Sequence, residues 1–385
     1  MNLRQKIEQE IRERGPIPFS RYMELCLYDP ELGYYSRNAE KFGKAGDFYT
    51  SSDVHAVFGR LLARQFEEMW RALGEPEQIE ILELGPGRGM FAQDVLDWSE
   101  KKFPDFFRAL DYTLAESSPS LRERLASRFR HRMEAGKVSL TGEDPSASSG
   151  QAARRSMNAE VPLIIFANEF FDALPVEVLS GKGTLRINVR EQHFVEEWAP
   201  PSAEELEFLD CYSVHPEGDA RSEAALLARQ HMAQYARMIQ RGFLVVIDYG
   251  YAREEQLAGR HLGTIMAYRQ HSASPNPYEA PGEQDITAHV NFSALAATAE
   301  QNGMHAHKLL TQSQFLLGIG EANQFADAFE DCRLPQERAK VALQLKHLAT
   351  PAGMGETFQV LVASKGVEPE RVTRLSGLSF ETMSR

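Results

Sequence analysis

Short apolar runs alternate with longer helix-like segments through the middle of the chain, and this alternation constrains the fold more than any other feature. Helix-like stretches such as 90–102 and 119–134 separate most of the apolar runs. Strands that alternate with helices predict an α/β fold, in which a parallel sheet is covered by helices on both faces. The strand-like runs are 80–84, 111–115, 138–140, 163–168 and 243–248.

The segments before and within this pattern have a different character. Residues 1–75 are expected to form a helical, loop-rich cap, because Gly15-Pro16 ends a first helix and 54–73 has a helical apolar rhythm. Residues 181–240 interrupt the α/β pattern. We expect an insertion there, made of a β-hairpin followed by a helix-like stretch at 218–240.

The later part of the chain is expected to complete the sheet. Runs at 307–316 and 357–364 could supply two closing strands, and 322–348 between them has a helical pattern. The core is therefore expected to consist of residues 76–180 and 241–365, with substrate-region elements within 265–355 and a tail at 366–385.

Charge and cysteine usage narrow the class of protein. Lys and Arg total 42 against 55 Asp and Glu, a net charge of −13, which argues against a general affinity for nucleic acid. The cysteines Cys26, Cys211 and Cys332 form no CxxC pair, so we expect neither a metal site nor a disulfide framework. No apolar run reaches the roughly 18 residues of a membrane span.

The N-terminal stretch also bears on localisation. MNLRQKIEQEIRERGPIPF carries charges of both signs and lacks the apolar core of a signal peptide. Its glutamates also argue against a transit peptide. We expect a cytoplasmic protein, with the mitochondrial matrix as the alternative if a presequence is missing from this sequence.

The run ILELGPGRGM, residues 81–90, joins a strand to a helix through three alternate glycines. One glycine is enough for a tight turn, so Gly85, Gly87 and Gly89 indicate a ligand that lies against bare backbone near a helix N-terminus. The GxGxG spacing differs from the GxGxxG of dinucleotide sites. S-adenosylmethionine (SAM) would fit such a turn and would need an acid, such as Glu83, for its ammonium group. A turn without any ligand is the alternative.

Glu116 ends the next strand, one strand–helix unit downstream. An acid at this position can accept hydrogen bonds from both ribose hydroxyls of an adenosine, a feature that SAM and NAD share. The alternative is a capping or solvent-facing acid. The glycine turn upstream favours the ribose interpretation.

The run FANEFFDALPV, residues 166–176, follows the fourth strand at the edge where open α/β sheets bind ligands. Asn168 is expected to cap a short helix. On such a helix Glu169 and Asp172, three residues apart, would face the same way and could hold a cationic group. Capping alone explains Asn168 but gives the two carboxylates no role.

Two further residues are candidates for the same site. Asp248 stands at the tip of the fifth strand, where a turn at Gly250 is an equally good explanation. His289 lies in PGEQDITAHVNF (281–292) and could act as a base, although a single histidine is more often structural.

Seven motifs in order resemble the MidA-like SAM-dependent methyltransferases, a family that includes a mitochondrial complex I assembly factor that methylates an arginine. The similarity runs from about Phe19 to about Ser364. The motifs are GDFYTSSDVHAVFG (46–59), ELGPGRG (83–89), NEFFDALPV (168–176), DYG (248–250), PGEQDITAHVNF (281–292), TQSQFLLGIG (311–320) and MGETF (354–358).

The resemblance implies a Rossmann-like class I methyltransferase core with a seven-stranded, mostly parallel sheet, a helical N-terminal cap and insertions. It implies SAM as cofactor and a protein arginine as acceptor, with a complex I subunit as one candidate. The cofactor-binding residues would be Glu83, Gly85, Gly87, Gly89, Glu116 and Asn168, with Phe48 and Thr50 of the N-terminal motif folded over the cofactor. The acceptor-site residues would be Glu169 and Asp172, assisted by Asp248 or His289.

Three alternatives stay open at this point. An NAD-type oxidoreductase would share the sheet, the glycines and Glu116, but it should show GxGxxG. A methyltransferase fold could serve as a non-catalytic assembly or binding module. The methyl acceptor could also be a small molecule, because a fold alone does not define a substrate.

Overall fold

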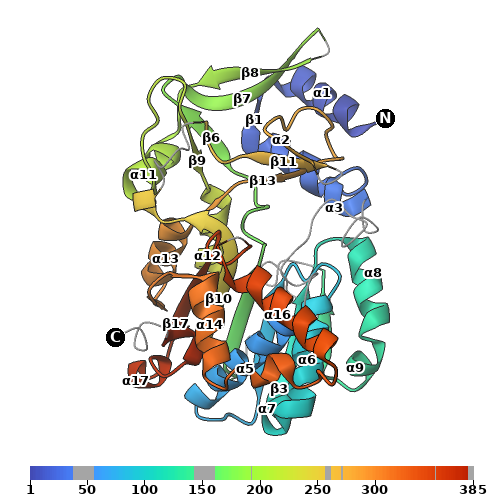
Figure 1. Ribbon diagram of the computed structural model, residues 1–385. Coiled ribbons are helices and arrows are strands. Elements are labelled where there is room, and N and C mark those ends of the chain that lie inside the picture. The colour runs from blue at the N-terminus through green and yellow to red at the C-terminus, as the bar shows by residue number, and fades with distance from the viewer. Residues whose placement is uncertain are drawn as a thin grey trace. The chain divides into compact units, whose positions relative to one another are not determined.

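The computed structural model describes residues 1–37, 56–142, 161–191, 193–255, 262–269, 272–351 and 353–379 (Figure 1). The chain divides into two compact units, each built from three separate segments. The first unit comprises Met1–Phe48, Phe170–Met232 and Tyr249–Thr298, and the second comprises Tyr49–Glu169, Ala233–Asp248 and Ala299–Arg385. These bounds do not coincide with the expected division at residues 75, 180 and 240.

The second unit is organised around the expected parallel sheet. The strands β10, β5, β2, β3 and β4 lie side by side in that order, and each neighbouring pair is parallel. Their apolar composition explains this arrangement, because β2 and β5 are buried along almost their whole length. The bounds are β2 (Ile79–Leu84), β3 (Leu110–Ala115), β4 (Val138–Thr141), β5 (Leu163–Asn168) and β10 (Gly242–Tyr251).

Four further described strands complete the sheet. The strand β17 (Phe358–Lys365) lies between β10 and β15 (His305–Ala306), and both β15 and β16 (Leu310–Thr311) pair with it antiparallel. Within the described residues, the row of neighbouring strands from β15 to β4 therefore has the expected seven members. With β16 and β14 (Val290–Asn291), which pairs with the end of β10, the count rises to nine.

The expected strand at 307–316 is only partly correct. Residues Leu310 and Thr311 form β16, but the helix α14 (Gln312–Glu321) begins directly afterwards. The side chain of Thr311 accepts a hydrogen bond from the backbone amide of Gln314, and the Gln314 side chain accepts one from the amide of Thr311. This capping box starts the helix and overrides the apolar run that suggested a strand.

Helices of the second unit pack against the sheet. Phe91 of α6 stacks on Phe166 of β5 with ring centroids 4.4 Å apart, and Phe66 of α5 meets the same ring edge-on at 5.5 Å. α5 was expected in the N-terminal cap, but its buried face belongs to this core. The helices are α5 (Ala56–Ala72), α6 (Met90–Lys102), α7 (Pro104–Ala109), α8 (Pro119–Arg128), α9 (Arg130–Glu134), α14, α15 (Ala326–Phe329), α16 (Pro335–Ala349), α17 (Pro369–Val372) and the 3₁₀ turn η2 (Ser376–Leu378).

The first unit contains two small antiparallel sheets. The predicted hairpin in the insertion is confirmed, because β7 and β8 pair antiparallel from Thr184–Ala199 to Arg190–His193. The stretch 218–240 is a strand and then a helix, not one helix. The strands are β1 (Ile17–Pro18), β6 (Glu177–Ser180), β7 (Gly183–Arg190), β8 (His193–Ala199) and β9 (Arg221–Ala224) in one sheet, and β11 (Met266–Arg269), β12 (Ser272–Ser274) and β13 (Asp285–Thr287) in the other.

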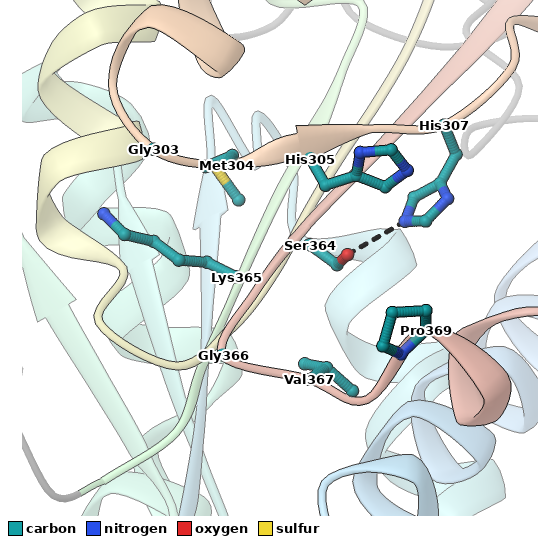
Figure 2. Close-up of a pocket in the computed structure, with 9 residues that line it drawn as sticks. All are labelled: Gly303, Met304, His305, His307, Ser364, Lys365, Gly366, Val367 and Pro369. Carbon is teal, nitrogen blue, oxygen red and sulfur yellow. Dashed lines mark hydrogen bonds between the residues drawn. The ribbon is translucent and has the colours of Figure 1, made fainter.

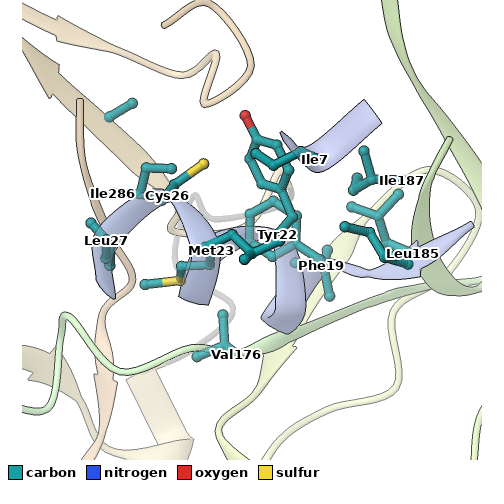
Figure 3. Packing of buried hydrophobic residues seen from close by; sticks show 14 of the residues in the cluster. Ile7, Phe19, Tyr22, Met23, Cys26, Leu27, Val176, Leu185, Ile187 and Ile286 are labelled. Atoms are coloured by element: carbon teal, nitrogen blue, oxygen red, sulfur yellow. The ribbon is translucent and has the colours of Figure 1, made fainter. Parts of the chain in front are cut away.

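The leader helices build the core of the first unit (Figure 3). Phe19, Tyr22 and Cys26 of α2 pack with Leu185 and Ile187 of β7 and with Ile286 of β13. Burial of each large side chain contributes roughly 1.5–3 kcal/mol, so α2 is an integral part of this unit. The remaining elements are α1 (Leu3–Arg14), α2 (Phe19–Tyr28), α3 (Tyr34–Arg37), α11 (Ala203–Tyr212) and η1 (Arg253–Glu255), together with α12 (Leu226–Met238) and α13 (Phe292–Gln301), whose residues divide between the units.

None of the helices within the described ranges has the length and hydropathy of a transmembrane span.

Candidate active site

The glycine turn lies where the sequence predicts it, between β2 and α6. The backbone amide of Gly85 donates to the carbonyl of Ala115 at the end of β3, over 3.0 Å, and the amide of Gly89 donates to the carbonyl of Pro86 over 2.8 Å. Gly85, Gly87 and Gly89 all have positive φ, at 61°, 53° and 72°. Residues that carry a side chain rarely adopt a positive φ, which explains why the turn requires glycine.

The surroundings of Gly87 and Gly89 differ in a way that indicates a ligand. A Cβ atom at Gly89 would lie 2.6 Å from Cδ2 of Leu125 and 2.7 Å from Cε2 of Phe129, so this glycine allows α8 to pack closely. A Cβ at Gly87 would meet no described atom within 4 Å. Gly87 therefore presents bare backbone to open space at the start of a helix, as an adenosyl ligand requires.

Glu116 lies directly against this turn. Its carboxylate accepts a 2.8 Å hydrogen bond from the backbone amide of Ser118 and lies near the amide of Gly87. Burial raises the pKa of Glu116 to about 7, and the backbone amides partly offset that effect. A buried acceptor next to the glycine turn has the chemistry needed for the ribose hydroxyls.

Glu83 is the second of the two acidic residues in β2. It is 5% exposed, and its carboxyl group accepts a 2.8 Å hydrogen bond from the hydroxyl of Tyr112 on β3. Burial raises the pKa of Glu83 to about 8, and the Tyr112 hydrogen bond opposes the rise. A nearby ammonium group would favour the ionised carboxylate, so the environment fits the predicted role, which stays a prediction.

The expected helix after β5 does not form. Asn168 is the last residue of β5, and its side-chain amide donates to Oε1 of Glu169 over 3.1 Å. Glu169 has φ 51°, a left-handed conformation that ends the strand sharply and prevents a helical turn. Asn168 is therefore no helix cap, and the helical argument for pairing Glu169 with Asp172 is wrong.

The sheet places Glu169 next to Asp248, but Asp248 is not the expected strand tip and Gly250 makes no turn there, because β10 continues to Tyr251. Asn168 on β5 is in register with Ile247 on β10, and the amide of Glu169 donates to the carbonyl of Ile247 over 3.0 Å. Asp248 follows Ile247 and is fully buried. The carboxyl edge of the second unit thus carries Glu83, the glycine turn, Glu116, Asn168, Glu169 and Asp248 on four neighbouring strands.

Asp172 and His289 belong to the first unit, where Tyr249 connects them. The Tyr249 hydroxyl donates to Oδ2 of Asp172, and its ring meets the His289 ring edge-on at 5.5 Å. Burial raises the pKa of Asp172 to about 6, although the Tyr249 hydrogen bond lowers it. The structure therefore groups the catalytic candidates in two sets, one on each unit.

Sequence reasoning missed four residues of this second set: Tyr35, Tyr249, Tyr268 and Asp285. The hydroxyl of Tyr35 donates to Oδ1 of Asp285 over 2.8 Å, and Tyr268 stands opposite Asp285 in the β11–β13 pairing. Asp285 lies in the same motif as His289, so its acidic side chain was a usable signal. We call Asp172, Asp285, Tyr35, Tyr249, Tyr268 and His289 the acid–tyrosine cluster.

The predicted cofactor residues Phe48 and Thr50 lie outside the described residues. Within the described ranges, no group of three or more His, Cys, Asp or Glu side chains is placed to hold a metal ion.

A cavity of about 280 Å³ lies elsewhere in the second unit (Figure 2). His307 hydrogen-bonds Ser364 over 2.9 Å, and burial lowers the pKa of His307 to about 4. Lys365 at the end of β17 donates to the carbonyl of Ala236, near the end of α12, and to that of Asn302, directly after α13. Gly366 lies beside Gln240 and Arg241, which precede β10, so this cavity is at the opposite edge of the sheet from the glycine turn.

The fold and the turn are those of a SAM-dependent methyltransferase. A family model described as "Putative S-adenosyl-L-methionine-dependent methyltransferase" matches residues 61–310. The chain belongs to this family, and the resemblance found in its sequence is confirmed. SAM is the cofactor, and the alternative of an NAD-type oxidoreductase is excluded.

The chain is also similar to curated relatives and to a solved structure. The mitochondrial protein arginine methyltransferase NDUFAF7 homolog of Drosophila melanogaster is 31% identical over 95% of this chain and 85% of its own length. The human protein arginine methyltransferase NDUFAF7 is 25% identical over 91% of this chain and 80% of its own length. A Burkholderia thailandensis protein solved with bound S-adenosyl-homocysteine is 28% identical, with a TM-score of 0.81 over 97% of this chain and 94% of that one.

Proposed function

We propose that this methyltransferase transfers the methyl group of SAM to an arginine side chain of a protein. The observation that carries the proposal is the 31% identity, over 95% of the chain, to a relative named as a protein arginine methyltransferase. The retained glycine turn and Glu116 favour catalysis over a non-catalytic binding module, because both are arranged for a ligand.

The second unit supplies the residues that hold the cofactor. Gly87 offers uncovered backbone, Glu116 offers acceptors for the ribose, and Glu83 offers a carboxylate for the ammonium group. When bound, SAM supplies the methyl group: the carbon–sulfur bond breaks with its electron pair left on sulfur, the guanidino nitrogen–carbon bond forms, and one N–H proton leaves.

Carboxylates of this chain orient the guanidinium and take up that proton. An arginine keeps its charge near neutral pH, since its pKa is above about 12, so the site needs acids to hold it. Glu169 and Asp248 are candidates on the second unit, and Asp172 with His289 on the first. Asp172 suits proton uptake because burial raises its pKa to about 6, closer to neutrality than an ordinary aspartate.

The acceptor protein is proposed from the same relatives. A subunit of respiratory complex I is our first candidate, by the resemblance to the mitochondrial assembly factor. The acidic chain, with a net charge of −13, is suited to a basic, arginine-bearing segment. A cytoplasmic location stays a prediction.

Incubation of the purified protein with radiolabelled SAM and a lysate of its own cells tests the proposal. We expect one labelled polypeptide, and acid hydrolysis of that polypeptide should release labelled methylarginine. A Glu116→Gln variant serves as the control, because it should bind SAM weakly. Label on another amino acid or only on small molecules would contradict an arginine acceptor.

A further inference from the structure

The acid–tyrosine cluster brings together residues from four distant parts of the first unit. Tyr35 comes from α3, Asp172 from the segment after β5, Tyr249 from the end of β10, and Asp285 from β13. Asp172, Tyr249 and Asp285 are 5%, 6% and 7% exposed, whereas Tyr35 and Tyr268 are half-buried. The two carboxylates are therefore buried, whereas Tyr35 and Tyr268 keep some solvent exposure.

The backbone around Asp172 is held from two sides. The Asp172 carbonyl accepts a 3.0 Å hydrogen bond from the amide of Ala288, which follows β13. The hydroxyl of Tyr28, at the end of α2, donates to the carbonyl of Ala173 over 3.0 Å. The segment after β5 is thus fixed between the leader helix and the β13 strand, and this fixes the direction of the Asp172 side chain.

The two carboxylates act on the same pair of phenols. Tyr268 stands opposite Asp285 in an antiparallel pairing, which places both side chains on one face of the sheet. The charges of Asp172 and Asp285 both raise the pKa of Tyr35 and of Tyr268, beyond the effect of burial. Tyr35 and Tyr268 therefore lie close to both acids.

Such a set of groups is suited to a cation and not to an anion. Buried carboxylates lose hydration, and a cation beside them reduces that cost. Phenol rings attract cations through their π faces. A guanidinium is planar, carries five N–H donors and stays charged, so it can hydrogen-bond two carboxylates while it stacks on a ring.

We propose that the acid–tyrosine cluster is the binding site for the guanidinium of the acceptor arginine, with Asp285, Tyr35 and Tyr268 joining Asp172 as specificity-determining residues. This assignment rests on the proposed arginine acceptor. It places acceptor recognition on the first unit and cofactor binding on the second.

Calorimetric titration of the full chain, saturated with S-adenosyl-homocysteine, tests the assignment. The probes are N-acetyl-arginine amide and its neutral counterpart N-acetyl-citrulline amide, which differ in charge but hardly in shape. We expect the wild type to bind the arginine probe at least about tenfold more tightly than the citrulline probe, the scale of one charged hydrogen bond.

The variants separate recognition from folding. Asp285→Asn can still accept the Tyr35 hydrogen bond but lacks the charge, so it should lose the arginine preference about tenfold or more. Tyr35→Phe should weaken the preference less. Glu283→Gln removes one charge two residues away, from a surface pair with Arg269, and should keep the full preference. A variant counts as folded if its affinity for S-adenosyl-homocysteine and its melting temperature equal those of the wild type.

Two results would overturn the assignment: a wild type that binds both probes equally, or a folded Asp285→Asn variant that keeps the arginine preference. The proposed function fails in a different way. A wild type that prefers the arginine probe but deposits no methyl group on protein arginine would contradict the reaction while the cation site stands.

Discussion

The backbone amide of Gly87 lies near enough to the carboxylate of Glu116 to lower its pKa. The turn after β2 therefore lies beside the residue after β3, so the two features that we assign to an adenosine site are neighbours. A rigid turn with its acceptor already in place reduces the ordering cost of ligand binding.

Gly87→Ala should weaken cofactor binding with little loss of stability. The new methyl group meets no described atom within 4 Å, so only backbone strain at φ 53° opposes it, at about 1–2 kcal/mol. It would occupy the space in which the ligand lies, and we expect at least a tenfold loss of affinity for S-adenosyl-homocysteine by calorimetry. Undiminished affinity would remove Gly87 from the site.

Gly89→Ala is the matched comparison for that variant. Its methyl group would lie 2.6 Å and 2.7 Å from side-chain atoms of Leu125 and Phe129, so α8 must shift. Overpacking of this kind costs about 1–3 kcal/mol in addition to backbone strain. Thermal unfolding should therefore show a clearly larger drop in melting temperature for Gly89→Ala than for Gly87→Ala.

Glu116→Gln should reduce SAM affinity by about tenfold to a hundredfold, because hydrogen bonds to a charged group contribute about 1.5–3 kcal/mol. Glutamine can still accept from the amide of Ser118, so the fold should be retained. Equilibrium titration with SAM measures the effect. Wild-type affinity in the variant would mean that Glu116 only braces the turn.

SAM binding near pH 7 should release a proton from Glu83. The pKa of Glu83 is about 8 in the free protein because of burial, and an ammonium group beside it should lower that pKa. Calorimetry in buffers of different ionisation enthalpy counts the released protons. Glu83→Gln should abolish this release; an unchanged proton count in the variant would show that another group is responsible.

The same residue predicts a pH dependence of stability. The pKa of Glu83 in the folded chain, about 8, lies above the value of 4.5 for an ordinary glutamate, so the unfolded chain ionises first. The free energy of unfolding of the wild type should therefore fall, relative to Glu83→Gln, as pH rises from about 4.5 to about 8. Denaturant titrations of both proteins across this range test the sign.

Glu169→Gln should leave SAM affinity intact and abolish turnover. Glutamine keeps an oxygen that can accept from the Asn168 amide, so the strand end should retain its shape. The lost charge should slow methyl transfer at least a hundredfold, since general acid–base groups contribute about 10²–10⁴. Normal turnover in this variant would make Glu169 a structural residue.

Turnover should fall below about pH 6 if Asp172 takes up the proton. The pKa of Asp172 is about 6, so its carboxylate is ionised above that pH and protonated below it. The acid limb of the pH–kcat profile should disappear in Asp172→Asn, with a low rate at every pH. A variant that retains the same acid limb would assign it to another carboxylate.

The geometry of the proposed cofactor half of the site could be predicted from the sequence because it is local. The strand, the three glycines and the next helix follow one another within ten residues, and Glu116 follows the next strand in the chain. Parallel pairing of consecutive strands brings such residues to one edge without any knowledge of side-chain packing.

The contacts of the proposed acceptor half could not be predicted, because they join distant parts of the chain. Tyr35 meets Asp285, and Asp172 meets Tyr249, through packing that no local pattern encodes. The expected helix at Asn168 failed for the opposite reason. The spacing of its polar residues suited a helix, but the left-handed backbone at Glu169 ended the strand in another way.

The position of β17 has a consequence for how the protein is made. This strand lies between β15 and β10 inside the sheet of the second unit, yet it follows the other described strands of that sheet in the chain. Until it leaves the ribosome, one side of β10 has no hydrogen-bonding neighbour there, and an open strand edge invites aggregation. A premature stop codon shortly before Phe358 should therefore yield insoluble protein, although every residue of the glycine turn has already been translated.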